Sequence, residues 1–305
     1  MESLLPAFEG AVTQGVLWGI MVLGVYITYR ILDIADLTVD GSFALGGSVC
    51  AVCVANGMNP FLALLLAMFA GVLAGFVTGF LHTVFEIPAI LAGILTQIAL
   101  WSINLHVMGK SNIPLLRMPT VNSQLSEATG MSLSAACLVI GIIFAAVVII
   151  ALYWFFGTQF GASIRATGCN EPMARAQGIN TQFTKVFGLA LSNGFVALAG
   201  ALLAQYSGKA DINDGRGAIV VGLAAIIIGE AIFSRISSNF IVRLLGVVIG
   251  GIIYYAVYST VINLGFDTDL LKALSALVVA VFLGIPYLKR KYFKRPAKKG
   301  DRKNA

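Results

Sequence analysis

Long stretches without a single charged residue constrain this chain more than any other feature. Residues 61–81 (FLALLLAMFAGVLAGFVTGFL) and 133–156 (LSAACLVIGIIFAAVVIIALYWFF) are uncharged, and each reaches the ~20 residues that a helix needs to cross a bilayer. Apolar residues make up 58% of the 305 residues and charged residues only 11%. A soluble helical core would lack polar surface to cover it, because soluble domains carry about 25% charged residues. The sequence therefore predicts an all-α, polytopic membrane protein.

The apolar stretches number about nine, within a range of eight to ten, and predict a membrane domain over residues 1–288. No small-residue cleavage site follows the first stretch, so it is expected to remain as a span. With nine crossings, the amino end lies outside and the carboxyl end in the cytoplasm. The stretches are 11–29, 41–55, 60–82, 87–106, 133–156, 183–206, 216–232, 240–262 and 269–287.

The orientation depends on a basic tail over residues 289–305. A basic segment after a membrane span usually marks the cytoplasmic side. No aromatic residue pattern or motif accompanies the lysines, so anionic membrane lipid is the expected partner of the tail and nucleic acid is not. The tail's basic residues are Lys289, Arg290, Lys291, Lys294, Arg295, Lys298, Lys299, Arg302 and Lys303.

Two of the apolar stretches, 41–55 and 216–232, are short, and each follows an Asp-Gly pair. Each comes second in a set of four stretches, with 133–156 between the sets. Because the number of spans between the two sets is odd, the two sets would have opposite orientations in the membrane. This arrangement is typical of an inverted repeat, in which broken helices line a substrate path. The sequence therefore predicts two short, broken or re-entrant helices.

A polar segment, RATGCNEPMARAQGIN, interrupts the apolar chain at residues 165–180. Asn170 is a good helix N-cap, Pro172 suits the first turn, and Gly178 can adopt the left-handed conformation that ends a helix. We expect a two-turn helix over 171–177, with a second short helical piece before it. So short a helix is marginal alone in water, so it needs a surface to dock on. Small residues in and around the helix suit insertion into a groove on a partner. The alternative is a surface helix without a partner. The small residues are Gly168, Ala174, Ala176 and Gly178.

This segment carries a resemblance to a known family. The pattern ATGxN…AxxxGIN over residues 166–180 resembles the coupling segment of bacterial ABC importer permeases of the branched-chain amino acid, ribose and nucleoside group. The stretches RILDIADLTVDGSFALGG (30–47) and GLAAIIIGEAI (222–232) resemble permeases grouped as tryptophan/tyrosine importers. The resemblance covers nearly the whole chain.

The resemblance implies a subunit that spans the bacterial cytoplasmic membrane and moves a small solute inward by alternating access. An amino acid is the implied solute, and the tryptophan/tyrosine group points to an aromatic one. The implied partners are an ATPase that binds ATP and Mg²⁺, a second permease copy, and an extracytoplasmic substrate-binding lipoprotein. The chain itself has no GxxxxGK[ST] loop for ATP. Residues 158–181 would be the cytoplasmic coupling segment, with contacts from Arg165, Ala166, Gly168, Asn170, Glu171, Ala174, Arg175, Gly178 and Ile179.

Polar residues inside apolar segments are candidates for the translocation path, since they are unfavourable there unless paired or hydrated. For the aspartates the alternative is a role as helix caps and interfacial ion pairs, and for the asparagines it is a hydrogen bond between helices. Glu230 has a candidate partner in Arg235 and is expected to brace the cytoplasmic mouth. The path or gate candidates are Asp36, Thr38, Asp40, Ser42, Asn104, Asn193 and Glu230.

Other function classes find less support. Cys50 and Cys53 lie in an apolar run, and His82 and His106 are isolated, so no metal site is expected. No nucleophile–base pair is evident, so no enzyme is expected. An ion-coupled secondary transporter remains an alternative because inverted repeats occur there too. A membrane scaffold without solute flux is a third class. The outer loop 107–131 could receive a binding protein or remain a solvated loop.

Overall fold

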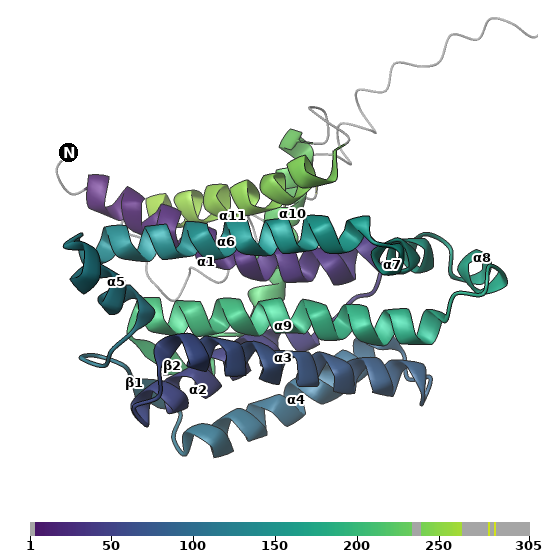
Figure 1. Cartoon of the computed structure of the whole chain (residues 1–305), viewed down its shortest axis with the longest axis horizontal. Helices are drawn as coiled ribbons and strands as arrows, with labels where there is room; N and C mark the ends of the chain where they lie inside the picture. The colour runs from purple at the N-terminus through teal and green to yellow at the C-terminus, as the bar shows by residue number, and fades with distance from the viewer. Residues whose placement is uncertain (1–3, 234–238, 264–279, 281–283, 285–305) are drawn as a thin grey trace, which may run out of the picture.

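The computed structural model describes residues 4–233, 239–263, 280 and 284, and helices dominate this part of the chain (Figure 1). The all-α prediction is confirmed. The two short strands are β1 (Asn112–Pro114) and β2 (Lys209–Asp211). The helices are α1 (Leu4–Tyr26), α2 (Thr38–Ala55), α3 (Pro60–Thr83), α4 (Ala89–Met108), α5 (Val121–Thr129), α6 (Leu133–Gly157), α7 (Gln159–Cys169), α8 (Glu171–Ala176), α9 (Thr181–Ser207), α10 (Ala218–Phe233) and α11 (Phe240–Asn263).

Seven of these helices are long and apolar enough to cross a membrane, and α10 is a shorter apolar helix. They correspond to the first eight predicted segments. The ninth, 269–287, and the basic tail lie outside the described residues except for positions 280 and 284, so a count of nine stays a prediction. The chain is thus a multi-pass membrane protein.

The long helices run roughly side by side, whereas α10 crosses behind them at a steep angle, and most connections gather at the two ends of the molecule (Figure 1). Helix α5 and both strands lie at one end, while α7 and α8 lie at the other. The strands pair antiparallel, with Ile113 opposite Ala210, and so tie the 107–131 loop to the segment after α9. We call the end with α5 and the two strands the strand end, and the end with α7 and α8 the hairpin end.

Glycines allow the central helices to approach closely. Gly71 and Gly75 on α3 leave room for the backbone of α9, while Gly15 and Gly19 on α1 face α11. A Cβ atom at any of these positions would meet backbone or side-chain atoms of the facing helix. The glycine face of α3 is therefore a helix-packing surface, as is typical of close-packed membrane helices.

Helices from one half of the chain pack on helices from the other half. Helix α3 packs on α9, and α11 packs on α1, while α2 lies against α3 and α10 against α11. Helices α1 and α9 run in opposite directions (Figure 1). If α1–α3 correspond to α9–α11, each contact in one half has its counterpart in the other. This pattern supports the predicted inverted repeat.

Helices α2 and α10 are short, and a segment without regular helix precedes each of them. The chain leaves α1 through a short π-helix, Ile27–Ile31, and residues 32–37 are not helical before α2 begins. Helix α10 begins only after the turn at 212–217. With 18 and 16 residues, the two helices are about 27 and about 24 Å long at 1.5 Å per residue. Both are shorter than the ~30 Å hydrocarbon core, which agrees with the predicted short helices.

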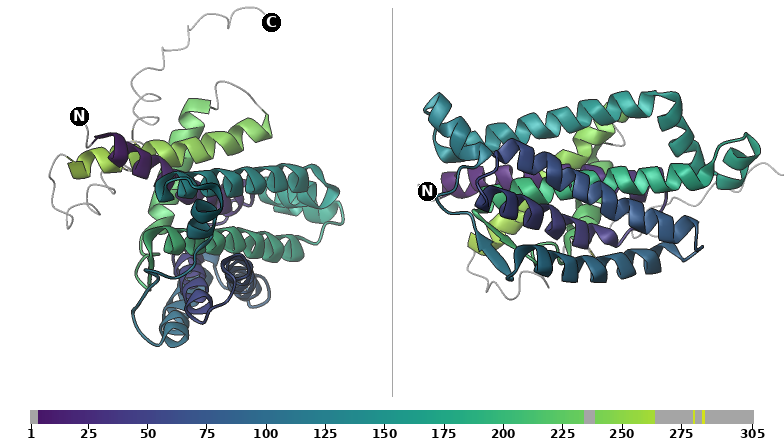
Figure 2. Two further views of the ribbon diagram at one scale, coloured as in Figure 1. Left: turned by 60° about the vertical axis from the view of Figure 1, so that its left-hand side comes forward. Right: turned by 60° about the horizontal axis from the view of Figure 1, so that its bottom comes forward.

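Helices α4 and α11 lie on opposite sides of the molecule (Figures 1 and 2). The sides of α3 and α4 that face outward carry large apolar side chains, which is expected of surfaces that contact lipid or another membrane helix. Helices α1 and α9 are instead largely buried inside the protein. The exposed side chains on α3 and α4 include Phe61, Leu65, Phe69, Phe76, Leu91, Leu95 and Trp101.

Candidate functional site

The polar segment folds into two short helices, α7 and α8, at the hairpin end (Figure 1). Asn170 caps α8 as predicted, and its Oδ1 accepts a hydrogen bond from the backbone N–H of Met173 at 3.1 Å. Pro172 lies in the first turn, and Gly178 follows the helix with φ of 82°. Helix α8 ends at Ala176, one residue before the predicted end. We call residues 159–180 the coupling hairpin, after the role that the resemblance implies for this segment.

Glu171 anchors the coupling hairpin to α9. One carboxylate oxygen of Glu171 lies 2.7 Å from Arg175, and the other lies 2.6 Å from Nζ of Lys185 on α9. The hydrogen bond from Lys185 is the main reason why the pKa of Glu171 lies below its usual value. The Nε of Arg175 also donates to Oγ1 of Thr181 at 3.1 Å. Glu171 therefore anchors α8 to α9, and its negative charge at the start of α8 also interacts favourably with the helix dipole.

Two of the small residues expected to face a partner instead face the body of this chain. Gly168 lies directly against the backbone carbonyl of Ile31, and a side chain there would overlap it. Ala174 is buried, with 3% of its surface exposed. In this structure Gly168 and Ala174 therefore pack on the chain itself, and their contact with a partner stays a prediction. Small residues permit close approach to any neighbour, and here the neighbour is the same chain.

The outer face of the coupling hairpin consists of other residues. Met173 is 62% exposed although it is apolar, and Arg175, Ala176 and Gly178 are also exposed. Among the remaining candidates, Arg165 donates from Nη2 to the carbonyl of Phe156 at 2.6 Å. Asn170 is exposed, while Ala166 and Ile179 are half-buried. No described residue covers the Met173 face, and Met173 was not among the contacts predicted from the sequence.

A buried polar network joins the break between α1 and α2 to α9. Asp36 is 3% exposed; its carboxylate accepts from Nδ2 of Asn193 at 2.7 Å and from the backbone N–H of Thr38 at 2.9 Å. The Thr38 hydroxyl lies 2.7 Å from that of Thr78 on α3. The structure brings three path candidates together, Asp36, Thr38 and Asn193, and the contact made by Asn193 is the interhelical hydrogen bond named as the alternative for the asparagines.

Asp40 links the starts of the two short helices. Its two carboxylate oxygens accept backbone N–H groups of Gly217 and Ile219, each at 2.9 Å. Asp40 belongs to the first turn of α2, so it caps α10 from the other half of the chain. Of the two interpretations of this aspartate, the structure favours a helix cap.

Glu230 pairs with a residue from the first helix. Its Oε1 lies 2.8 Å from Nε of Arg30, which follows α1. The suggested partner Arg235 lies outside the described residues. The Arg30–Glu230 pair joins the ends of α1 and α10 and fits the bracing role expected of Glu230.

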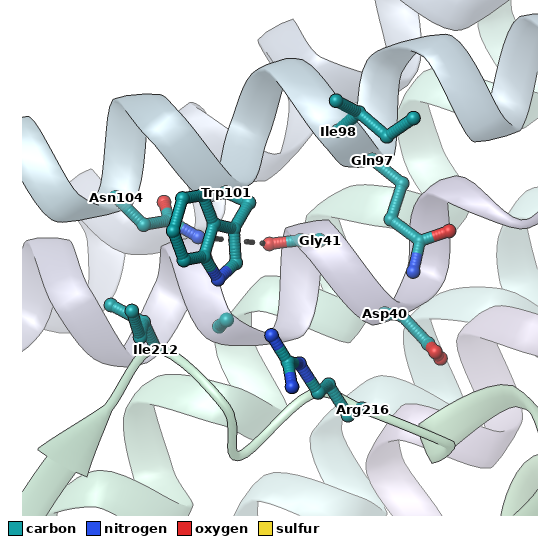
Figure 3. Close-up of a pocket in the computed structure, with 9 residues that line it drawn as sticks. Asp40, Gly41, Gln97, Ile98, Trp101, Asn104, Ile212 and Arg216 are labelled. Atoms are coloured by element: carbon teal, nitrogen blue, oxygen red, sulfur yellow. Dashed lines mark hydrogen bonds between the residues drawn. The ribbon is translucent and has the colours of Figure 1, made fainter. Parts of the chain in front are cut away.

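A cavity of about 300 Å³ opens between α2, α4 and the segment 212–217 (Figure 3). It brings together two of the predicted path residues, Asp40 and Asn104; Ser42 is buried nearby on α2 but does not line it. The Trp101 indole and the Arg216 guanidinium are turned toward one another in Figure 3. We call this cavity the α2–α4 pocket. Its lining is Asp40, Gly41, Ala44, Gln97, Ile98, Trp101, Asn104, Ile212 and Arg216.

Three lining residues, Gln97, Trp101 and Arg216, were not among the predicted path residues. A signal for two of them was present, because Gln97, Trp101 and Asn104 recur at i, i+4 and i+7 and so share one face of α4. Arg216 comes just after the second Asp-Gly pair. Its approach to α4 depends on how the two halves of the chain pack, which local spacing does not reveal.

Comparison with known proteins identifies the family. Residues 7–284 match the family described as the branched-chain amino acid transport system, permease component. The chain belongs to this family. The predicted resemblance is thereby confirmed. Among the described residues, no group of three or more His, Cys, Asp or Glu side chains could hold a metal ion.

Individual relatives of this permease agree with the family match. A tyrosine transport system permease protein of Clostridioides difficile is 39% identical over 272 residues, which are 89% of this chain and 88% of that protein. The inner membrane ABC transporter permease YjfF of Escherichia coli is 27% identical over 90% of this chain and 80% of its own length. An inward-facing metal-chelate type ABC transporter has a similar fold, with a TM-score of 0.50 and 13% identity over 93% of this chain and 85% of that one. The chain is therefore an ABC importer permease, and such permeases imply a separate ATPase partner.

Proposed function

We propose that this permease carries an amino acid, most readily an aromatic one, into the cytoplasm by ATP-driven alternating access. The family supports the transport of a small solute, and the similarity to a tyrosine transport permease favours an aromatic amino acid. ATP and Mg²⁺ would be bound by the partner ATPase. A second copy of the permease and an extracytoplasmic substrate-binding lipoprotein would complete the importer.

The coupling hairpin is the proposed contact with the ATPase, and one observation carries this assignment. The hairpin presents exposed Met173 outward, while its Gly168 rests on the carbonyl of Ile31. Ile31 ends the π-helix before the break between α1 and α2. A displacement of the hairpin by the ATPase would therefore press on that break, because close-packed backbones leave no space to absorb the movement.

The break is in turn connected to the two short helices. Asp36 holds the break against Asn193 on α9, and Asp40 holds α2 against the start of α10. Movement of residues 32–37 would thus reorient the elements that line the α2–α4 pocket. In this mechanism the hairpin end faces the cytoplasm and the strand end faces outward, with the amino end outside and the carboxyl end inside. The loop 107–131, tied to β2 through β1, would face the binding protein.

Co-purification with the ATPase tests the assignment. Met173→Glu places a charge on the outer face of the hairpin, whereas Phe85→Glu makes the same change in the α3–α4 connection at a residue that is 63% exposed. Burying an unpaired charge is strongly unfavourable, so Met173→Glu should reduce ATPase recovery by at least about tenfold. Phe85→Glu should leave recovery unchanged, with both variants inserted in the membrane to equal amounts.

Full ATPase recovery and full uptake by Met173→Glu would exclude the outer face of α8 as the coupling surface. Uptake that persists without any ATPase and follows an ion gradient would instead support a secondary transporter. Recovery is measured at purification, and uptake is measured in proteoliposomes prepared with and without the ATPase.

A further inference from the structure

The α2–α4 pocket contains a cation that no described residue neutralises. The carboxylate of Asp40 is already engaged by the backbone N–H groups of Gly217 and Ile219. The Arg216 side chain is exposed and forms neither a hydrogen bond nor an ion pair with the described part of the chain. A guanidinium presents its donors in a planar fork that matches a carboxylate. The pocket is therefore suited to a solute with a carboxylate group.

Neutral acceptors line the same pocket. Asn104 is 1% exposed, and its Nδ2 lies 3.4 Å from the carbonyl of Gly41, while its Oδ1 has no hydrogen-bond partner among the described residues. A buried polar atom without a partner is unfavourable, so an incoming donor would stabilise it. Gln97 lies on the same face of α4 and adds a second amide to the wall. An ammonium group carries three donors and no acceptor, which these two amide oxygens complement.

An aromatic surface completes the pocket. Trp101 is 42% exposed and faces Arg216 across the cavity, with Ile212 beside it (Figure 3). Aromatic rings pack favourably on an indole in offset or edge-to-face arrangements. The volume of about 300 Å³ is at the lower end for small-molecule sites, which suits one small solute rather than a peptide.

We propose that the α2–α4 pocket is a transient binding site for a zwitterionic amino acid during transport. Arg216 holds the carboxylate, the amide oxygens of Asn104 and Gln97 accept the ammonium group, and Trp101 contacts an aromatic or apolar side chain. This inference rests on the proposed function and specifies where that solute binds. A sugar or another uncharged solute would leave Arg216 without a counter-ion, so the charges in the pocket favour the zwitterion.

Uptake in proteoliposomes tests the site. The permease is reconstituted with its ATPase and a binding protein saturated with L-[³H]tyrosine, so that delivery is equal for all variants. Arg216→Gln should reduce uptake by about tenfold or more, because a hydrogen-bonded ion pair is lost, and Arg216→Lys should restore part of it. Trp101→Leu should reduce uptake by about threefold to tenfold. Trp154→Leu, which changes a 72% exposed tryptophan on α6, should have no effect.

Competition for direct binding identifies the groups that are recognised. Binding of L-[³H]tyrosine to the permease–ATPase complex is measured without binding protein. L-Tyrosine methyl ester lacks the carboxylate, and 3-(4-hydroxyphenyl)propionate lacks the ammonium group. Each should compete at least about tenfold less well than L-tyrosine, and Arg216→Gln should abolish the preference for tyrosine over its ester.

The outcomes separate this inference from the proposed function. If the unaltered importer takes up tyrosine and Arg216→Gln and Trp101→Leu do so equally well, the pocket is not the site although the function stands. Equal competition by the methyl ester would likewise exclude the carboxylate contact. If the unaltered importer takes up no amino acid, the proposed substrate and the zwitterion site are both wrong.

Discussion

Asn193 on α9 donates a 2.7 Å hydrogen bond to the carboxylate of Asp36, which is buried in the break between α1 and α2. The two residues are separated by 157 positions, so the bond joins the two halves of the chain. Because the break has few regular backbone hydrogen bonds, this side-chain contact holds the end of α1 and the start of α2 in place. The stability of the break should therefore depend on Asn193.

Asn193→Ala should destabilise the permease, because it leaves a buried carboxylate with one donor fewer. Leaving a buried polar group short of a hydrogen-bond partner costs about 1–3 kcal/mol, so a clear fall in the thermal unfolding midpoint is expected in detergent. Asn56→Ala changes an exposed asparagine with no such bond and should stay within about 0.5 kcal/mol. Equal unfolding midpoints for the two variants would contradict a structural role for the Asp36–Asn193 bond.

Asp40→Ala should loosen the start of α10 although the substitution lies on α2. Asp40 accepts backbone N–H groups at Gly217 and Ile219, and loss of an N-cap is unfavourable by about 0.5–2 kcal/mol. Hydrogen exchange at 217–219 should become faster by up to about thirtyfold. Asp40→Asn keeps one acceptor and should have a smaller effect. Unchanged exchange in Asp40→Ala would show that α10 does not need the cap.

The pH dependence of the coupling hairpin follows from Glu171. Its pKa is below the usual value because the charged form is hydrogen-bonded to Lys185, so the stabilisation is present above the unfolded pKa of about 4.3 and is lost as pH falls through the folded pKa. Protection of α8 against hydrogen exchange, corrected for the intrinsic rates, should therefore stay constant between about pH 8 and 5 and fall only below about pH 4. Glu171→Gln should remove this transition. A loss of protection near neutral pH would contradict the assignment.

Local features of the hairpin were predictable from the sequence. A single residue suffices to cap a helix or to end one, so Asn170 and Gly178 were identified from their types and spacing. The long apolar spans and the two short ones were equally predictable from the sequence, because their lengths are compared with a fixed bilayer thickness.

Contacts between distant segments were not predictable in the same way. Gly168 and Ala174 suit close approach to any surface, and their types do not say whether that surface belongs to the same chain. Glu230 has a basic residue nearby in sequence, yet its observed partner is Arg30, 200 positions away. The α2–α4 pocket likewise arises where residues of both halves meet. Such pairings depend on the packing of the repeat rather than on local spacing.

The contact between Gly168 and the carbonyl of Ile31 leads to the last prediction. Gly168→Val places a branched side chain against backbone that has no flexible atom to yield, and overpacking of this kind costs about 1–3 kcal/mol. The hairpin should then stand away from the break while its outer face, including Met173, stays exposed. We expect the ATPase to co-purify normally and ATP hydrolysis to continue, whereas uptake per ATP should fall by about tenfold or more.

The chain offers a matched control in Gly157, at the end of α6, where an added Cβ would meet no atom within 4 Å. Gly157→Ala should leave uptake, ATP hydrolysis and co-purification unchanged. If Gly168→Val transports as efficiently as Gly157→Ala, force does not pass through the Gly168–Ile31 contact, and the hairpin must act through its contacts with α6 and α9. If Gly168→Val loses the ATPase altogether, the substitution has disrupted the docking face. The prediction that docking and force transmission depend on different faces of the hairpin is then wrong. If the ATPase is retained and uptake is lost, the Gly168–Ile31 contact transmits force from the ATPase to the α1–α2 break.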